Sequence, residues 1–186
     1  TVPTITSFTS TTADGSYKSA GTVNITATAS EAVVSGNTIT ATLDTSDNVT
    51  LTAAANGTTL VGTYTVGAGD NSNDLTVSSF SIGTVTDIAG NAMSGTDVPD
   101  TNIASGSAIV IDTTVPTITS FTSTTADGSY KSAGTVNITA TASEAVVATN
   151  TITATLDTSD NVTLTAAANG TTLVGTYTVG AGDNSN

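Results

Sequence analysis

The sequence predicts an all-β protein built as an antiparallel β-sandwich. Three observations lead to this fold class. Threonine makes up about a quarter of the 186 residues and valine is abundant, and both are β-branched residues that favour strands. Apolar and polar residues alternate in short runs that are separated by turn residues. The third observation is that the chain almost repeats itself, which indicates a tandem array.

The repeat has a period of 113 residues. Residues 1–73 recur as residues 114–186, and only two aligned positions differ: Ser35 becomes Ala148, and Gly36 becomes Thr149. This period is longer than the ~20–45 residues of a solenoid repeat and close to the size of a small autonomous domain. We therefore expect a complete unit, a second unit truncated before its last two strands, and a linker stiffened by proline: residues 1–113, residues 114–186 and linker residues 111–117.

Period-two alternation identifies each strand of the unit in turn. In the clearest strand, Val23 and Ile25 share one face and polar residues occupy the other. The Ser-Glu pair at residues 30–31 is predicted to turn the chain, and the Asn-Gly pair at residues 56–57 is a strong hairpin signal. The predicted strands are residues 5–8, 23–28, 33–43, 49–53, 60–66, 75–85 and 108–111.

Two local features refine this strand assignment. The alternation slips in phase at residues 78–79, which predicts a β-bulge. Residues 12–21 and 67–74 are rich in glycine and aspartate and are predicted to be loops. Seven strands in about 110 residues, joined by short connections, are typical of an immunoglobulin-like antiparallel β-sandwich. Such a fold places the first and last strands at opposite ends, so successive units are expected to extend the chain.

The charge balance excludes several kinds of partner. The chain has 15 acidic residues and only two basic ones, Lys18 and Lys131, which makes nucleic acid and anionic membranes poor partners. No apolar run approaches the ~18 residues of a membrane span, so no membrane insertion is expected in this segment. Without cysteine, histidine or arginine the chain lacks most catalytic side chains, and we expect no enzyme. Divalent cations are the partners that the charge favours.

Five motifs occur in order along the repeat: the linker DTTVPTI, the turn ADGSYKSAG, the segment SEAV, the loop TVGAGDNSNDL and the loop TDIAGNAM. In this order they resemble the tandem immunoglobulin-like repeats of giant bacterial surface adhesins and biofilm proteins. The resemblance implies an extracellular, cell-surface protein whose repeats are structural spacers that hold an adhesive tip away from the cell. The partners it implies are neighbouring repeats of the same chain.

The resemblance also implies bound calcium, within or between repeats. One departure is that Thr22 and Thr135 stand where members of the family often have an acidic residue, which favours fewer ions per repeat. The residues to which the resemblance assigns calcium roles are Asp112, Glu144, Asp87 and Asn91.

The sorting of loops in a sandwich adds two residues to this set. Asp14 is expected at the end of the unit where Asp112 leaves it, and Glu31 at the opposite end with Asp87. Across the linker, Asp112 and Glu144 are expected to approach each other. Calcium takes 6–8 oxygen ligands, which carboxylates, carbonyls and amide oxygens can supply. The alternative reading is that these are turn residues, because aspartate and asparagine favour turns for backbone reasons alone.

Two alternatives to a spacer function remain open. The chain could be the subunit of a self-assembling extracellular filament or surface layer, in which identical subunits complete the truncated unit by strand complementation. It could also be a carbohydrate-binding module, with Tyr17 and Tyr64 as platforms on which sugars stack.

Overall fold

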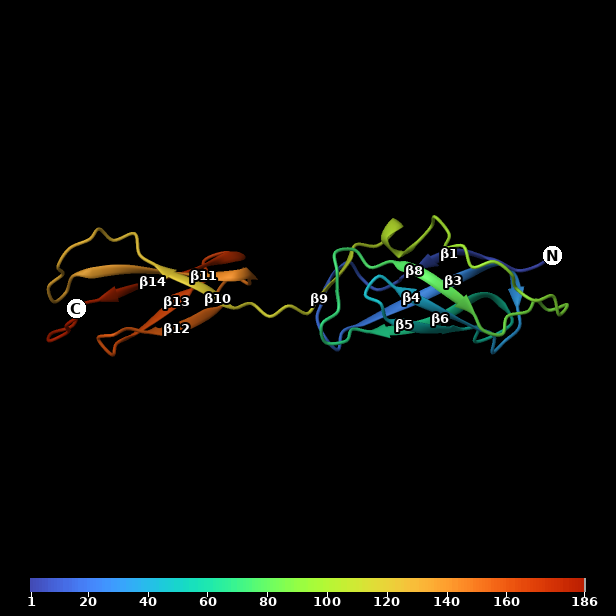
Figure 1. The fold of residues 1–186 in the computed structure, drawn as a ribbon, viewed down its shortest axis with the longest axis horizontal. Helices are drawn as coiled ribbons and strands as arrows, with labels where there is room; N and C mark the ends of the chain where they lie inside the picture. Colours follow the sequence, from blue (N-terminus) through green and yellow to red (C-terminus); the bar gives the residue numbers. More distant parts are fainter. Residues whose placement is uncertain (186) are drawn as a thin grey trace. The chain divides into compact units, whose positions relative to one another are not determined.

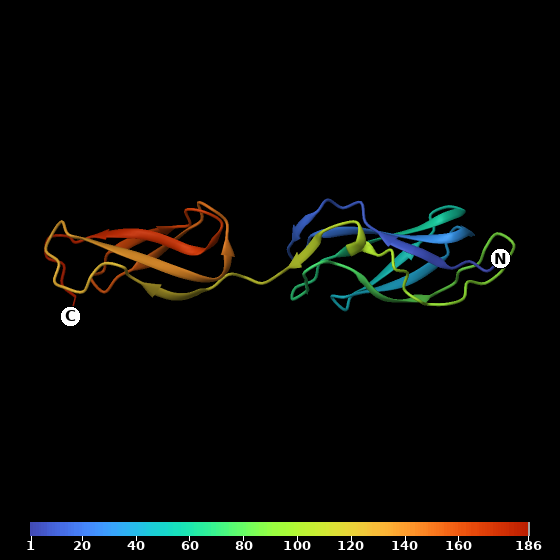
Figure 2. The same cartoon turned by 90° about the horizontal axis from the view of Figure 1, so that it is seen from above.

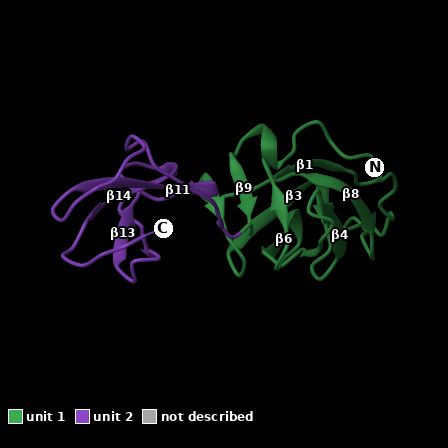
Figure 3. Ribbon diagram, turned by 60° about the vertical axis from the view of Figure 1, so that its left-hand side comes forward, with its two compact units in different colours: residues 1–114 green, residues 115–186 purple. Residues whose placement is uncertain are grey.

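A computed structural model describes residues 1–185 and divides the chain into two compact units (Figure 3). Unit 1 comprises Thr1–Thr114 and unit 2 comprises Val115–Asn186. Both are built from β-strands, and the described residues contain no α-helix (Figure 1). The antiparallel ladders form sandwich-like arrangements, so the predicted all-β sandwich class is confirmed.

Unit 1 contains two sheets. The larger has the strand order β1-β3-β6-β5-β4-β8, and the smaller has the order β2-β9-β7. All pairs in the larger sheet are antiparallel, whereas β2 runs parallel to β9. The strands are β1 (Ile5–Thr9), β2 (Gly15–Tyr17), β3 (Thr22–Val33), β4 (Thr38–Leu43), β5 (Asn48–Thr52), β6 (Gly57–Thr65), β7 (Asn71–Ser72), β8 (Val77–Ile82) and β9 (Ile109–Asp112).

The long strand β3 shows how alternation produces the core. Val23 and Ile25 are fully buried, while the intervening Asn24 and Thr26 are only partly buried, as the period of two predicts. The ring of Phe8 on β1 contacts the ring of Phe80 on β8 edge to face, with the ring centroids 5.6 Å apart. Since β1 and β8 are the two edge strands of the larger sheet, both edges of that sheet contribute to one apolar core.

The predicted turn at residues 30–31 is wrong. Both residues lie inside β3, which runs to Val33, and the following strand begins only at Thr38. The pairing of β3 with β6 is irregular between Thr28 and Val33, so the strand continues through the residues that were predicted to turn. The turn itself lies further on, at Gly36, whose φ of +83° is in the left-handed region that suits glycine.

Two predicted loops contain short strands. β2 lies in the first and β7 in the second, and both pair with β9. Runs of two or three mostly polar residues have no detectable alternation, so their pairing depends on β9 rather than on their own sequence. The predicted bulge is confirmed: Thr42 pairs with Ser79 and Leu43 with Val77, which leaves Ser78 unpaired. A 3₁₀ turn, η1 (Ile103–Ser105), precedes β9.

Unit 2 repeats half of this architecture. Its strands are drawn in yellow to red in Figure 2. Its single sheet has the order β10-β11-β14-β13-β12 and corresponds to β1, β3, β6, β5 and β4 of unit 1, with the same register. No counterpart of β2, β7, β8 or β9 is present among its described residues. The strands are β10 (Ile118–Thr122), β11 (Thr135–Val146), β12 (Thr151–Thr155), β13 (Asn161–Thr165) and β14 (Gly170–Thr178).

Candidate functional site

The first group of candidate ligands lies at the end of unit 1 from which the chain leaves. Asp112 ends β9 and pairs with Asn71, and its carboxylate accepts a hydrogen bond from the Thr114 N–H at 3.0 Å. Asp14 precedes β2, and its Oδ1 accepts from the Ala108 N–H at 2.9 Å. Each carboxylate thus accepts one hydrogen bond from a backbone N–H next to β9. Among the described residues, its second oxygen has no hydrogen-bond donor.

The second group lies at the opposite end of unit 1. Asp87 bridges to Val33 at the end of β3, and its two carboxylate oxygens accept from the N–H and the side-chain amide of Asn91, each at 2.7 Å. These hydrogen bonds, led by the one from the side chain of Asn91, lower the pKa of Asp87. The structure therefore brings together Asp87 and Asn91, which the sequence analysis paired.

Glu31 lies on β3 two residues before the bridge to Asp87, so it belongs to the same end of the unit. Its Oε1 atom is shielded from solvent and has no hydrogen-bond partner, and the same is true of Oε1 of Glu144 in unit 2. A buried carboxylate oxygen without a partner is costly, and a bound cation is one way to satisfy it. The same glutamate of the repeat therefore has an unsatisfied carboxylate oxygen in each of the two units.

The structure does not bring the candidates into one cluster. Within residues 1–185, no three acidic side chains come close enough to hold a metal ion together. Asp112 and Glu144 belong to different units, so their approach across the linker stays a prediction. The carboxylates of Asp14, Asp87 and Asp112 accept hydrogen bonds from backbone or amide donors, in the way that turn residues usually do.

The sequence analysis missed a tyrosine–aspartate pair, which both units contain. The Tyr64 hydroxyl donates to Asp70 Oδ2 at 2.5 Å, and the Gly67 N–H donates to the same oxygen at 2.6 Å. Burial of the phenol raises the pKa of Tyr64, and the hydrogen bond from Tyr64 lowers the pKa of Asp70. In unit 2, Tyr177 and Asp183 form the same pair.

The pair closes the loop that follows β6 in unit 1 and the loop that follows β14 in unit 2. It also bears on the prediction that Tyr64 is a platform on which sugars stack. Tyr64 is 2% exposed, so its ring is a core element and not a platform on which a sugar can stack. The signal in the sequence was a tyrosine six residues before an aspartate in both copies of the repeat. That spacing has no regular secondary-structure meaning, because the loop between the two residues sets their distance.

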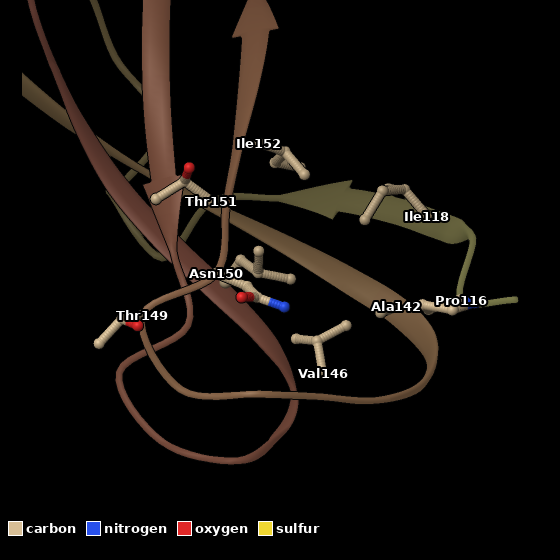
Figure 4. Close-up of a pocket in the computed structure, with 9 residues that line it drawn as sticks. Pro116, Ile118, Ala142, Val146, Thr149, Asn150, Thr151 and Ile152 are labelled. Carbon is tan, nitrogen blue, oxygen red and sulfur yellow. The ribbon is translucent and has the colours of Figure 1, made fainter. Parts of the chain in front are cut away.

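Unit 2 has a hollow that unit 1 lacks (Figure 4). It has a volume of about 480 Å³ and lies beside β12, between the start of β10 and the end of β11. Mostly apolar side chains and the amide of Asn150 surround it. In unit 1 the segment of residues 82–86 occupies the corresponding space. Its Thr86 N–H donates to Asn37 Oδ1 at 2.8 Å, and its Ile82 pairs with Ile39. The lining residues are Pro116, Ile118, Ala142, Val146, Thr149, Asn150, Thr151, Ile152 and Leu173.

Comparison with known proteins adds no family: the chain matches no protein-family model, and no curated protein is significantly similar to it. Among the described residues, no helix is long and apolar enough to cross a membrane.

Proposed function

We propose that the two units are structural spacer repeats of an extended bacterial cell-surface adhesin. The observation that carries this proposal is the repetition itself: a 73-residue sequence occurs twice with two differences, and both copies form the same five-stranded arrangement with the same register. In unit 1 the chain enters beside β3 near Ser30 and leaves after β9 beside Asn71, at the other end of the sandwich (Figure 1). Units of this kind can be added one after another without disturbing their neighbours.

The chemistry of the side chains supports a mechanical rather than a catalytic role. The chain carries a net charge of −13 and has no histidine, cysteine or arginine, so few groups can act as nucleophile, base or electrophile. A high negative charge keeps extended arrays soluble and apart from one another. We infer that the repeats set a distance, and that adhesion belongs to another part of the protein to which they are joined.

Calcium is the ligand that we propose for the connection between the units. Asp112 stands at the exit of unit 1, and Glu144 supplies a shielded carboxylate oxygen in unit 2 that has no hydrogen-bond partner. A cation shared by such groups would limit the movement of the linker, because removing the cation leaves like charges to repel one another. The pair formed by Glu31 and Asp87 at the start of unit 1 is the equivalent position toward a preceding repeat.

Small-angle X-ray scattering on chains of one, two and three copies of residues 1–113 tests the spacer function. The maximum dimension should rise by a constant increment for each added copy in millimolar calcium. EDTA should broaden the distribution of dimensions without unfolding the units. A maximum dimension that fails to grow with copy number would contradict the proposal.

Matched variants of the chain separate calcium binding from general charge effects. Asp112→Asn and Glu144→Gln should each abolish the response to calcium in scattering and in isothermal titration calorimetry. Asp97→Asn is the control, because Asp97 is an exposed carboxylate that loses the same charge outside the proposed site. If all three variants respond to calcium like the unaltered chain, the ion does not bind where we propose. Antibody labelling of intact producing cells tests the surface location.

A further inference from the structure

The turn that joins β5 to β6 contains a chemically reactive pair of residues. Asn56 is exposed in this turn and is followed by Gly57, the first residue of β6. The same pair, Asn169 and Gly170, stands before β14 in unit 2, and no other asparagine of the chain is followed by glycine. The backbone nitrogen of the residue after an asparagine can attack its side-chain amide, and glycine leaves the path open because it has no Cβ.

The structure leaves the reacting groups of Asn56 accessible. Its Oδ1 accepts a hydrogen bond from the Ser35 N–H at 2.8 Å, and within residues 1–185 its side-chain nitrogen has no hydrogen-bond acceptor. A Cβ placed on Gly57 would meet no atom within 4 Å outside its two chain neighbours, so a five-membered ring has room to form. The Ser35 N–H lies at the oxygen on which negative charge develops during the attack, as a donor of an oxyanion hole does.

Asn71 shows how the same fold protects an asparagine. It is followed by Ser72, which is also small, but both residues lie in β7 and pair with β9. The side chain of Asn71 is held at both ends: Nδ2 donates to the Gly69 carbonyl at 3.1 Å, and Oδ1 accepts from the Thr113 N–H at 3.2 Å. The attack requires rotation of the asparagine, which these contacts resist, whereas Asn56 lies outside the strands.

We propose that Asn56 is a site of spontaneous deamidation and that Asn169 is the same site in unit 2. The backbone nitrogen of Gly57 loses its proton and bonds to Cγ of Asn56, and the side-chain nitrogen takes up a proton and leaves as ammonia. Water then opens the resulting succinimide ring at either of its two carbonyl carbons. The products are aspartate and isoaspartate, and water is the co-reactant.

Both products change the turn. Each adds one negative charge to a chain that is already acidic. Aspartate keeps an oxygen in place for the Ser35 N–H, whereas isoaspartate adds one carbon to the backbone directly before the pairing of Gly57 with Val33. The inference depends only on this turn and does not require the calcium sites or the spacer function.

The test incubates the full, folded chain at mildly alkaline pH, where more of the attacking nitrogen is deprotonated. Peptide mapping by mass spectrometry should locate the conversion of amide to acid at Asn56 and Asn169. Labelling by an isoaspartate methyltransferase should increase over the same period. Asn71 should remain an amide in the folded chain and begin to convert when urea unfolds the chain, because its protection comes from the fold.

Gly57→Ala is the matched variant, because Gly57 lies outside the left-handed region and has open space for a methyl group. It should slow the conversion of Asn56 by about tenfold or more, since the methyl group hinders the approach of the nitrogen. Asn169 in the same molecule is the internal reference, and its rate should not change. The proposal is overturned if Asn56 stays an amide in the folded chain while the urea-unfolded chain converts. It is equally overturned if Asn71 converts as fast as Asn56 in the folded chain, or if Gly57→Ala leaves the rate at Asn56 unchanged.

Discussion

Units 1 and 2 place the same residues in different surroundings. β3 and β11 have identical sequences, identical bounds within the repeat and the same register with their neighbours. Val23 is nevertheless fully buried in β3, while Val136, its counterpart in β11, is only partly buried. The unit with residues 74–112 has a closed core, and the unit without them has half of one.

This difference separates two effects that are usually observed together. The five shared strands and their register form in both units, because all five lie within the repeated 73 residues and pair with one another. Burial of the apolar face depends on a segment that follows later in the chain and crosses to the other layer. We expect the free energy of unfolding to follow burial rather than strand content, since apolar area removed from water is the main stabilising contribution.

The largest effect is expected for a matched pair of phenylalanine truncations. Phe8→Ala should lower the free energy of unfolding of unit 1 by about 3–5 kcal/mol, because it leaves a cavity beside Phe80. Phe121→Ala should lower that of unit 2 by less than about 1 kcal/mol, because its side chain is mostly in solvent. Differential scanning calorimetry of the full chain resolves the two transitions. Equal losses in both units would contradict this account.

The next effect concerns an asparagine that is buried in one unit only. Asn37 is 8% exposed and its Oδ1 accepts from the Thr86 N–H, whereas Asn150 is exposed. Asn37→Ala should destabilise unit 1 by about 1–3 kcal/mol, because a backbone donor loses its partner. Asn150→Ala should change the stability of unit 2 by no more than about 0.5 kcal/mol. Urea denaturation of both variants gives the comparison, and a large effect at Asn150 would show that unit 2 is closed by another contact.

A smaller effect is expected at one of the two positions that differ between the repeats. Gly36 has a φ of +83° and Thr149 a φ of +71°, in turns with the same backbone hydrogen bonds. A β-branched residue is strained there, so Gly36→Thr should destabilise unit 1 and Thr149→Gly should stabilise unit 2, each by about 1 kcal/mol. The control is Ser35→Ala, the other natural difference. Thermal unfolding that moves in the opposite direction would rule out backbone strain as the cause.

The smallest effect is expected from pH, through the pair of Tyr64 and Asp70. The pKa of Asp70 in the folded unit lies below its ordinary 3.8, so the ionised carboxylate stabilises unit 1 above that pH and the contribution is lost as the pH falls through the folded value. The raised pKa of Tyr64 has the opposite sense: its contribution is complete below pH 10 and is lost as the pH rises above it. Solvent screening keeps the acid effect small.

Variants of the tyrosines assign this pH dependence to a unit. Tyr64→Phe should flatten the acid and alkaline limbs of the unit 1 transition and leave unit 2 unchanged. Tyr177→Phe should do the same for unit 2, where the hydrogen bond to Asp183 raises the pKa of the tyrosine. Calorimetry between pH 2 and pH 11 gives both profiles, and Asp97→Asn serves as the charge control. A profile unchanged in Tyr64→Phe would mean that other groups dominate the titration.

Much of the fold could be predicted from local residues, and the errors have local reasons. The bulge at Ser78 and the hairpin before β6 followed from a phase slip and an Asn-Gly pair. The turn predicted at residues 30–31 was wrong because an irregular ladder and a turn look alike in sequence. β2 and β7 were missed because strands of two or three residues take their pairing from β9.

The candidate site was predictable where its residues are close in the chain. Asp87 and Asn91 are four residues apart, and a turn of that length brings their side chains together. The shielded oxygens of Glu31 and Glu144 were not predictable as such, because they depend on how the irregular end of β3 and β11 packs. The contact of Tyr64 with Asp70 depends on the path of a loop, for which the sequence has no periodic signal.

The sequence by itself determined most of the longer strands, their faces and the repetition of the unit, because alternation and turn residues act over a few neighbours. The tertiary structure alone decided which apolar faces become core. Phe8 and Phe121 have the same neighbours along the chain, yet one is enclosed and the other exposed, because the ring of Phe80 is present beside only the first. Burial is a property of the contacts between distant segments, and no local pattern can report whether the covering segment is there.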